Sequence, residues 1–400
     1  MEFGPILRTL LRNKTRFMLI TIEVALTLAI AVNCVNMMQD MQRQMDEPTG
    51  IDVSNIIVVR SLPFSEDFRD EEYLKNCQRA DAELIRALPG VLSADTVSQI
   101  PLSGSGSSSS YKPLGSEINT LSTAVLWGGV DVLKTLGAEL DSGRDLVRQD
   151  INDADSKNVL ITKAYADRLF PEQNALGQQL QGRTADNPHT IVGIIEHMHG
   201  FWPGWPYIAH VMVVPGEPGS FNWGTRYMVR TEPGQLESVF PIIEEALLAA
   251  NDGRNVRVET LAEIKAETFQ ANTAVVKMLA AVIALLIFVT ALGIVGMTSF
   301  SVAERTHTIG TRRALGARQV DIVRYFLAEN WIIISSGLVL GMGLTLLLNY
   351  LLVTLVNGAA LNWMLLAYGA FLMWAVGLMS ALFPAWKGAR IPPAIATRNV

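Results

Sequence analysis

The chain has 400 residues, half of which are hydrophobic, and its mean hydropathy is +0.27. A soluble protein of this size rarely reaches that value, so the composition argues against a wholly soluble protein and predicts membrane-spanning helices. The net charge of −6 hides an asymmetry, because residues 39–276 contain 33 Asp and Glu against 19 Lys and Arg while the remainder is basic. The basic residues flank apolar runs instead of forming one patch, which argues against nucleic-acid binding.

The N-terminal part is predicted to lie on the membrane and then to cross it. Residues 1–16 are basic, with Ile and Leu at helical spacing, which predicts an amphipathic helix on the cytosolic membrane surface. Residues 17–38 form an apolar run of about the 20 residues that a first span needs. A cleaved signal peptide with Ala29-Ile30-Ala31 as its cleavage site is the alternative, but the apolar run continues beyond that point.

Glu23 lies inside this first span. At a helical rise of about 1.5 Å per residue, its carboxyl group is predicted to lie roughly 9 Å below the cytosolic edge. A carboxylate at that depth costs a few kcal/mol unless it faces protein or water. Two interpretations therefore stay open: a polar helix–helix contact within the bundle, or a protonated group close to the interface.

Residues 39–270 are soluble in character and long enough for one or two compact subdomains. Their pattern predicts an α+β fold inserted between the first and second spans. The predicted strands are 54–61, 91–100, 125–130, 158–161, 190–195, 207–214 and 226–230, and the predicted helices are 71–88, 131–137, 163–170 and 240–250. The serine-rich stretch 103–110 is predicted to be a flexible loop or a joint between subdomains.

Three of the histidines in this block, His197, His199 and His210, raise the question of a metal site. No carboxylate or cysteine stands at a familiar ligand spacing, so surface histidines beside an aromatic loop are the favoured interpretation. That loop, residues 201–207, contains Phe201, Trp202 and Trp205. Its rings either contact a ligand or partner, or they pack on one another and hold the loop in place. The second interpretation is favoured.

No catalytic motif stands out. The serine-rich stretch lacks the G-x-S-x-G spacing of a nucleophile elbow, and no G-x-x-x-x-G-K-[ST] phosphate-binding loop occurs. We therefore expect no ATP hydrolysis and no cofactor in this chain. Cys34 and Cys77 are expected to be unpaired thiols, with a disulfide as the alternative.

The C-terminal half predicts three more spans. Residues 259–277 contain no helix breaker and are predicted to form a stalk helix that continues into the second span. Gly337 and Gly341 form a G-x-x-x-G pair in the third span, which favours close helix packing. The predicted segments are 278–300 for the second span, 301–330 for a cytosolic connection, 331–356 for the third span, 357–363 for a short outside turn, 364–386 for the fourth span and 387–400 for a cytosolic tail.

Charge predicts the orientation of these spans. The 301–330 segment is short and basic, as are the stretches before the first span and after the fourth. Because short Lys/Arg-rich loops stay in the cytosol, both termini are predicted to be cytosolic and the large block to be outside. The cytosolic connection is too short for a catalytic domain but can hold one or two helices that contact a partner.

The strongest motif lies in this connection, and it resembles the MacB/FtsX-like family of ABC transporter permeases, also called type VII or mechanotransmission transporters. The family pattern is like E-R-x-x-E-I-G-x-x-R-A-x-G-A, and this chain supplies Glu304, Arg305, Ile309, Gly310, Arg313, Ala314, Gly316 and Ala317. Thr308 departs from the acidic residue that is usual there. Residues 159–180, 190–195 and 389–398 also resemble family segments, in the same order along the chain.

The resemblance implies a permease subunit in the bacterial inner membrane, with a periplasmic domain built of Porter-like and Sabre-like subdomains. It implies a second permease subunit, identical or different, and a cytosolic ATPase that binds ATP and Mg. The ATPase would contact residues 304–317, including Arg312 and Leu315, and a periplasmic adaptor and membrane lipids are further expected partners. The cargo stays open, and a transmembrane ligand sensor and a membrane-anchored enzyme are the alternative classes.

Overall fold

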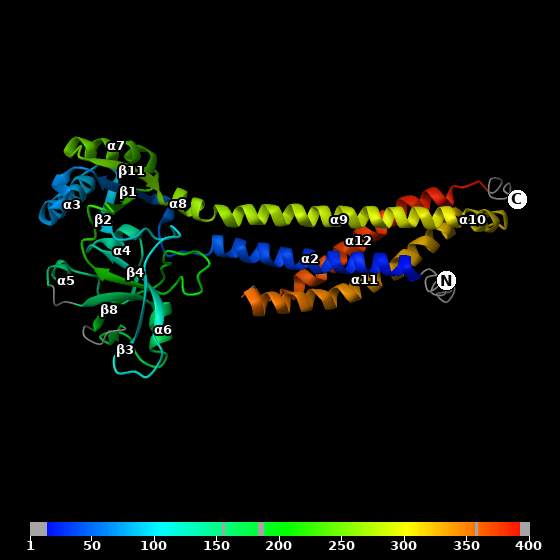
Figure 1. The fold of residues 1–400 in the computed structure, drawn as a ribbon, viewed down its shortest axis with the longest axis horizontal. Coiled ribbons are helices and arrows are strands. Elements are labelled where there is room, and N and C mark those ends of the chain that lie inside the picture. Colours follow the sequence, from blue (N-terminus) through cyan, green and yellow to red (C-terminus); the bar gives the residue numbers. More distant parts are fainter. Residues whose placement is uncertain (1–13, 154–156, 183–187, 357–358, 393–400) are drawn as a thin grey trace. The chain divides into compact units, whose positions relative to one another are not determined.

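The computed structural model describes residues 14–153, 157–182, 188–356 and 359–392 (Figure 1). The chain divides into two compact units. We call residues 1–43 with 272–400 the helical unit and residues 44–271 the sheet unit. Most of the amphipathic helix expected at 1–16, part of the turn expected at 357–363 and most of the expected tail lie outside the described residues.

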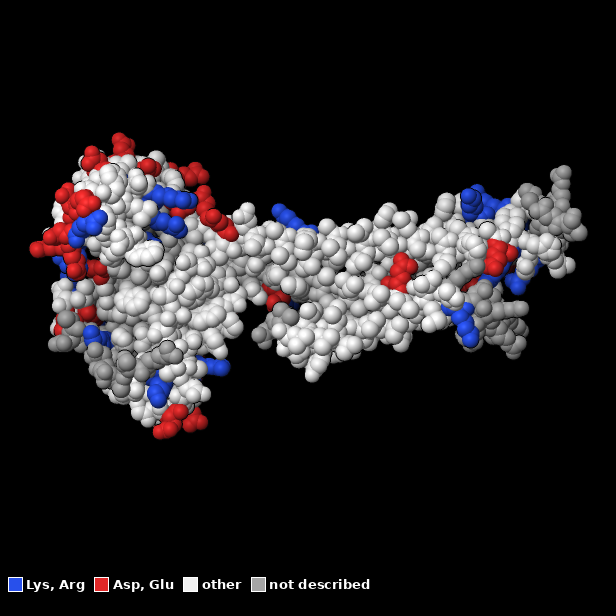
Figure 2. Space-filling model, viewed as in Figure 1, with Lys and Arg blue, Asp and Glu red and all other residues white. Residues whose placement is uncertain are grey.

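The helical unit consists of long helices whose sequences contain extended apolar runs. Its elements are α2 (Lys14–Asp46), α9 (Gln270–Glu304), α10 (Thr306–Ala314), α11 (Gln319–Val356) and α12 (Trp363–Ala389). Within the described part of the chain, four of these helices, α2, α9, α11 and α12, are long and apolar enough to cross a membrane. Few charged atoms interrupt their middle stretches on the face drawn in Figure 2. The chain is therefore an α-helical membrane protein with four candidate spans and a large α/β domain inserted between the first two.

The sheet unit is a mixed α/β domain. Its strands are β1 (Ile56–Pro63), β2 (Val91–Val97), β3 (Ser108–Pro113), β4 (Leu121–Gly128), β5 (Leu140–Gly143), β6 (Asn158–Thr162), β7 (Gln179–Gln181), β8 (His189–Ile195), β9 (Val211–Pro215), β10 (Thr225–Thr231) and β11 (Arg254–Thr260). Its α-helices are α3 (Glu71–Arg86), α4 (Val132–Leu136), α5 (Arg148–Asn152), α6 (Lys163–Leu169), α7 (Leu236–Ala250) and α8 (Leu261–Thr268).

The strand order of the sheet unit shows two halves. The first half runs β11-β1-β10-β2 and is antiparallel throughout. The second half runs β4-β3-β7-β8-β6-β9 and returns to β4 through a parallel β4–β9 pairing, so its strands form a closed ring. The halves join where Val97 of β2 pairs with Gly128 of β4.

Strand β1 shows why the first half is a sheet with two covered faces. Ile57 and Val59 pack with buried residues of α3 and α7, whereas Ile56 and Val58 belong to the core on the opposite face. All four side chains are fully buried. Because successive strand residues point to opposite faces, burial on both faces requires an uninterrupted apolar run, which is the pattern of this strand.

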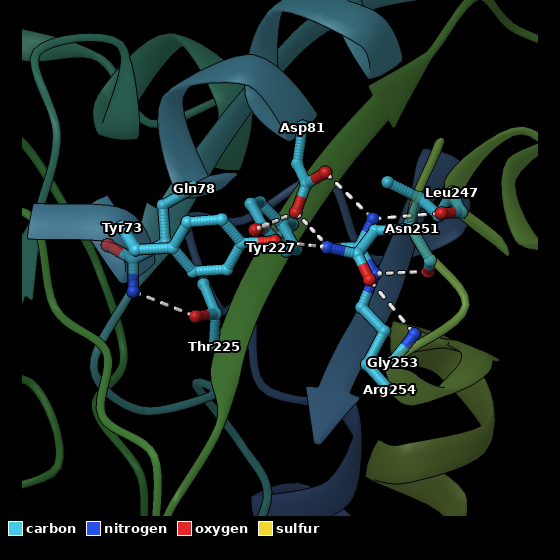
Figure 3. Close-up of polar contacts among 9 residues, drawn as sticks. All are labelled: Tyr73, Gln78, Asp81, Thr225, Tyr227, Leu247, Asn251, Gly253 and Arg254. Atoms are coloured by element: carbon cyan, nitrogen blue, oxygen red, sulfur yellow. Dashed lines mark hydrogen bonds and ion pairs between the residues drawn. The ribbon is translucent and has the colours of Figure 1, made fainter. Parts of the chain in front are cut away.

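A buried ion pair ties the helices of the first half to its sheet (Figure 3). Arg254 of β11 is 2% exposed and forms two hydrogen bonds to Asp81 of α3, one of them Nη2 to Oδ1 at 2.9 Å. Tyr227 of β10 donates to Asp81 Oδ2 at 2.7 Å, and Arg254 also donates to the carbonyl of Leu247 in α7 at 2.8 Å. The charges of the pair are thus compensated by several hydrogen bonds, which a buried ion pair needs in order to be tolerated.

The expected unbroken helix over residues 259–277 is wrong. Strand β11 continues to Thr260, whose hydroxyl accepts from the Glu263 backbone while the Glu263 carboxylate accepts from the Thr260 backbone, which starts α8. This reciprocal capping is a strong start signal for a new helix. Helix α8 ends at Thr268, and α9 begins at Gln270. The interruption at Phe269 lies close to the boundary between the two units.

Two further predictions for the sheet unit are corrected by long-range pairing. The serine stretch is not wholly a loop, because Ser108, Ser109 and Ser110 pair with residues 122–124 of β4. The strand expected at 207–214 begins only at Val211. In both cases the partner strand, which is distant in the sequence, decides where the strand lies.

Candidate functional site: the segment between α9 and α11

The segment 304–318 folds as a short helix between two long ones. Helix α9 ends at Glu304, and α10 spans Thr306–Ala314. The chain then turns at Gly316, whose φ of +99° is disfavoured for residues with a side chain. The Arg318 backbone donates to Asp321 Oδ2 at 3.0 Å, and α11 follows from Gln319.

One face of α10 is anchored in a small apolar core. Ile309 is 4% exposed and packs with Ile322 and Phe326 of α11 and with the C-terminal end of α12. Gly310 beside it is also buried. These two residues of the family motif therefore hold the segment against α11 and α12.

Arg305 is committed to a contact inside the chain. Its guanidinium donates to both Glu329 oxygens of α11, at 2.8 and 3.0 Å, and to the Tyr325 hydroxyl at 3.1 Å. Glu329 is 6% exposed. Such a bidentate pair fixes geometry as well as charge, so Arg305 is a positioning residue that sets where α10 leaves α9.

The two neighbouring arginines differ in their surroundings. Arg313 is half-buried and donates to the carbonyl oxygens of Ala389 at 2.9 Å and Ile391 at 3.2 Å. Arg312 is exposed, and its guanidinium carbon lies 5.2 Å from the centre of the Tyr325 ring. Of these two arginines, Arg312 is the accessible one.

The outward-facing part of the segment is small and apolar. Leu315 is 84% exposed, and Ala314 and Gly316 on either side of it are exposed as well. We call these three residues the tip. Glu304 is also exposed, whereas Ala317 is partly buried against the core of this segment. The predicted site residues thus separate into an inner set that positions the segment and an outer set that a partner can reach.

The remaining predicted positions lie where the long helices approach each other. A Cβ added to Gly337 would lie 2.9 Å from Val24 Cβ of α2, and one added to Gly341 would lie 3.0 Å from Ala25 Cα. Real Cβ atoms rarely come so close, so the two glycines permit the contact of α11 with α2.

Glu23 lies against α9. A Cβ added to Gly293 would lie 2.7 Å from a Glu23 carboxyl oxygen. One turn further along α2, the hydroxyls of Thr27 and Thr290 are 2.8 Å apart. Glu23 and Thr27 therefore both lie on the side of α2 that faces α9.

The expectation that His197, His199 and His210 are surface residues is wrong for two of them, because His199 is 3% exposed and His210 is 8% exposed. The His197 and His199 rings contact each other, with centroids 4.9 Å apart, and burial chiefly lowers the pKa of His199 to about 4. His210 stacks on Tyr207. Among the described residues, no group of three or more metal-ligating side chains occurs.

The aromatic loop is pinned by its own rings. Phe201, Trp202, Trp205 and Tyr207 contact one another in sequence, with centroid distances of 5.3 to 5.5 Å. Phe201 is 1% exposed and belongs to the main core. This arrangement is the interpretation that the sequence favoured for the loop.

The described residues thus form four apolar helices, a large domain inserted after the first, and a short anchored helix between the second and third, which is the layout of a multi-pass membrane protein. The model of the MacB-like periplasmic core domain matches residues 17–258, and the model of the FtsX-like permease C-terminal domain matches residues 280–393. The chain belongs to the MacB/FtsX-like permease family.

Several curated proteins are similar to the chain. The macrolide export ATP-binding/permease protein MacB of Neisseria meningitidis serogroup A is 24% identical over 355 residues, covering 86% of this chain and 52% of the relative. MacB of Agrobacterium fabrum is 30% identical over 235 residues, covering 56% of this chain and 35% of the relative. The pyoverdine export ATP-binding/permease protein PvdT of Pseudomonas fluorescens is 26% identical over 299 residues, covering 70% of this chain and 45% of the relative. The chain spans about half the length of the first of these relatives and less of the others.

Among solved structures, the periplasmic region of MacB from Actinobacillus actinomycetemcomitans is similar to the chain, with 14% sequence identity and a TM-score of 0.37. The match covers 54% of this chain and 92% of the chain in that structure.

Sequence reasoning missed the partner of Arg305. The available signal was Glu329, an acidic residue placed directly before the apolar run of the third predicted span. A carboxylate there needs a partner, and Arg305 in the preceding segment could supply it.

Proposed function

We propose that this chain is the permease part of a bacterial ABC exporter in the inner membrane, with both termini cytosolic and the sheet unit periplasmic. An ATPase supplied from outside this sequence would bind ATP and Mg, and its movements would act on α10. The observation that carries the proposal is the tip at residues 314–316, an exposed apolar surface on a segment that is otherwise anchored on α11 and α12.

The anchoring supports a role in transmission. The Arg305–Glu329 pair and the Arg313 hydrogen bonds connect α10 to α11 and α12. A force on the tip would therefore act on two long helices together. Export is proposed as the direction because the similar proteins from Neisseria and Pseudomonas are named for export. A second permease subunit and a periplasmic adaptor are further proposed partners.

Co-purification tests the proposed contact. Ala314→Trp adds volume at an exposed position and changes no charge, so insertion should be normal while binding of the co-produced ATPase is lost. Ala249→Trp, at an exposed alanine of α7, is the matched control. If the arginines of the segment only hold it beside lipid head groups, both variants will bind the ATPase as the wild type does, and the proposal fails.

The orientation is tested separately with an impermeant thiol reagent on intact cells. In a background without Cys34 and Cys77, Leu114→Cys of the sheet unit should react from outside. Leu315→Cys, although highly exposed, should react only after the membrane is opened. Reaction of Leu315→Cys in intact cells would contradict the proposed orientation.

A further inference from the structure

The sheet unit contains a cleft of about 540 Å³ that the transmission role does not use. It is lined by β1, β10, the loop 99–105, the loop before β10 and one face of α8. The volume lies within the range of pockets that hold small organic molecules, roughly 300 to 1,000 Å³. All of its lining residues belong to the sheet unit.

Arginines stand side by side on the strands at one wall of the cleft. Arg60 of β1 lies directly opposite Arg226 of β10 in the antiparallel register, and opposite Arg257 of β11 on its other side. Residues paired in this way share one face of the sheet, and like charges in such pairs repel. Arg60 and Arg226 both line the cleft.

These two guanidinium groups are incompletely neutralised. Arg226 is half-buried and donates to the carbonyl of Ser98 at 2.9 Å, and the described part of the chain gives it no carboxylate partner. Burial and the neighbouring charge of Arg60 lower the pKa of Arg226. Arg60 Nε is 3.7 Å from Glu259 Oε2, too far for a hydrogen bond, and neither atom has another partner among the described residues.

The other walls supply apolar and aromatic surface. Trp223 is 74% exposed although it borders the cleft, and Leu62, Ile100 and Ile264 also line it. A tryptophan offers a flat face that can stack on a ring. Glu267 of α8 lines the cleft as well, so a second negative charge would be repelled there.

The loop at this wall is held in a fixed conformation. Leu102 has a φ of +63°, which a leucine rarely adopts, and its N–H donates to the Gly200 carbonyl at 3.0 Å. The Gly104 N–H donates to the Phe201 carbonyl at 2.8 Å. The cleft wall is therefore preformed, which reduces the entropy cost of binding.

We propose that this cleft binds a small organic monoanion with a flat apolar body. Its carboxylate or similar group would pair with Arg60 and Arg226, and its body would stack on Trp223. The inference concerns the sheet unit alone and stands independently of the proposed contact with an ATPase.

The test is isothermal titration of the full chain in nanodiscs, with empty nanodiscs as the blank. The probe is 2-naphthoate, and 2-naphthamide is its neutral isostere. We expect 2-naphthoate to bind with a Kd at least about tenfold lower than 2-naphthamide, as a charge-assisted hydrogen bond predicts. Arg226→Gln should remove that difference, while Arg168→Gln, at an exposed arginine outside the cleft lining, should leave it unchanged.

Trp223→Ala provides a second variant that folding should tolerate, because the side chain is largely exposed. It should weaken the binding of both naphthalene probes by a similar factor. Equal affinity for 2-naphthoate and 2-naphthamide, no saturable binding of 2-naphthoate, or full binding by Arg226→Gln would each overturn the proposal.

Discussion

Replacing Leu315 by serine tests whether the tip is a binding surface. Complete burial of a leucine side chain contributes about 1.5–3 kcal/mol. Leu315 is 84% exposed in the isolated chain, so most of that free energy is still available to a partner. Since about 1.4 kcal/mol corresponds to a tenfold change in affinity, we expect Leu315→Ser to raise the Kd for the ATPase by about 10- to 70-fold.

The assay is binding of the purified ATPase to the chain in nanodiscs, measured by biolayer interferometry at constant salt. Folding should be unaffected, because the side chain makes little contact within the chain. The matched control is Leu114→Ser, at another exposed leucine, 47% exposed and in the sheet unit. An unchanged Kd for Leu315→Ser, or an equal change for Leu114→Ser, would refute the assignment of the tip as the contact surface.

Three further predictions concern the fold. Asp81→Ala leaves Arg254 buried without its counterion and should lower the stability of the sheet unit by about 3–5 kcal/mol, measured by hydrogen exchange of β10 amides in the full chain; exchange at wild-type rates would contradict this. Burial is the main reason why the pKa of Asp95 rises to about 6 in the folded protein. The folded state therefore favours the protonated carboxyl group. The stability that this preference contributes is fully present below the unfolded pKa of about 4 and is lost as the pH rises through 6. Asp95→Asn should abolish that loss of stability. The measurement compares the thermal unfolding of the wild type and the variant from pH 4 to 7. Parallel stability profiles of the two proteins would contradict the prediction. Ala271→Pro should be tolerated because it lies in the first turn of α9, whereas Ala274→Pro removes an i→i−4 hydrogen bond and should lower the thermal stability; equal effects would show that α9 begins elsewhere.

The helical unit was the easier part to predict from the sequence. Apolar runs of span length admit few alternatives to membrane helices, and the G-x-x-x-G pair pointed to a close helix contact that α11 makes with α2. The bounds were less accurate, because α2 and α9 continue as helices into polar sequence, to Asp46 and from Gln270. Hydropathy marks where an apolar run stops and not where a helix stops.

The sheet unit was harder, because its strands depend on distant partners. Strand β11 carries alternating Val256 and Val258, whereas the sequence predicts a helix from Glu259 onward, which overlaps the last two residues of the strand. The cap formed by Thr260 and Glu263 was visible as a T-x-x-E pattern and would have placed the start of α8 correctly. The pairing of β3 with β4 had no comparable local signal.

The candidate site was predicted as a segment, but the direction of each side chain was not. Sequence alone treats Arg305, Arg312 and Arg313 as equivalent basic residues. Their roles separate only once Glu329 and the end of α12 are placed beside them. These contacts join Arg305 to a residue 24 positions away and Arg313 to one 76 positions away, which no local periodicity reports.

Photocrosslinking at position 315 tests the central claim most directly. A photoreactive amino acid replaces Leu315 in the assembled transporter, and the same residue replaces Leu114 as the control. The account predicts a covalent adduct with the ATPase from position 315 and none from position 114. An assembled, ATP-hydrolysing complex that gives no adduct from position 315 would contradict it.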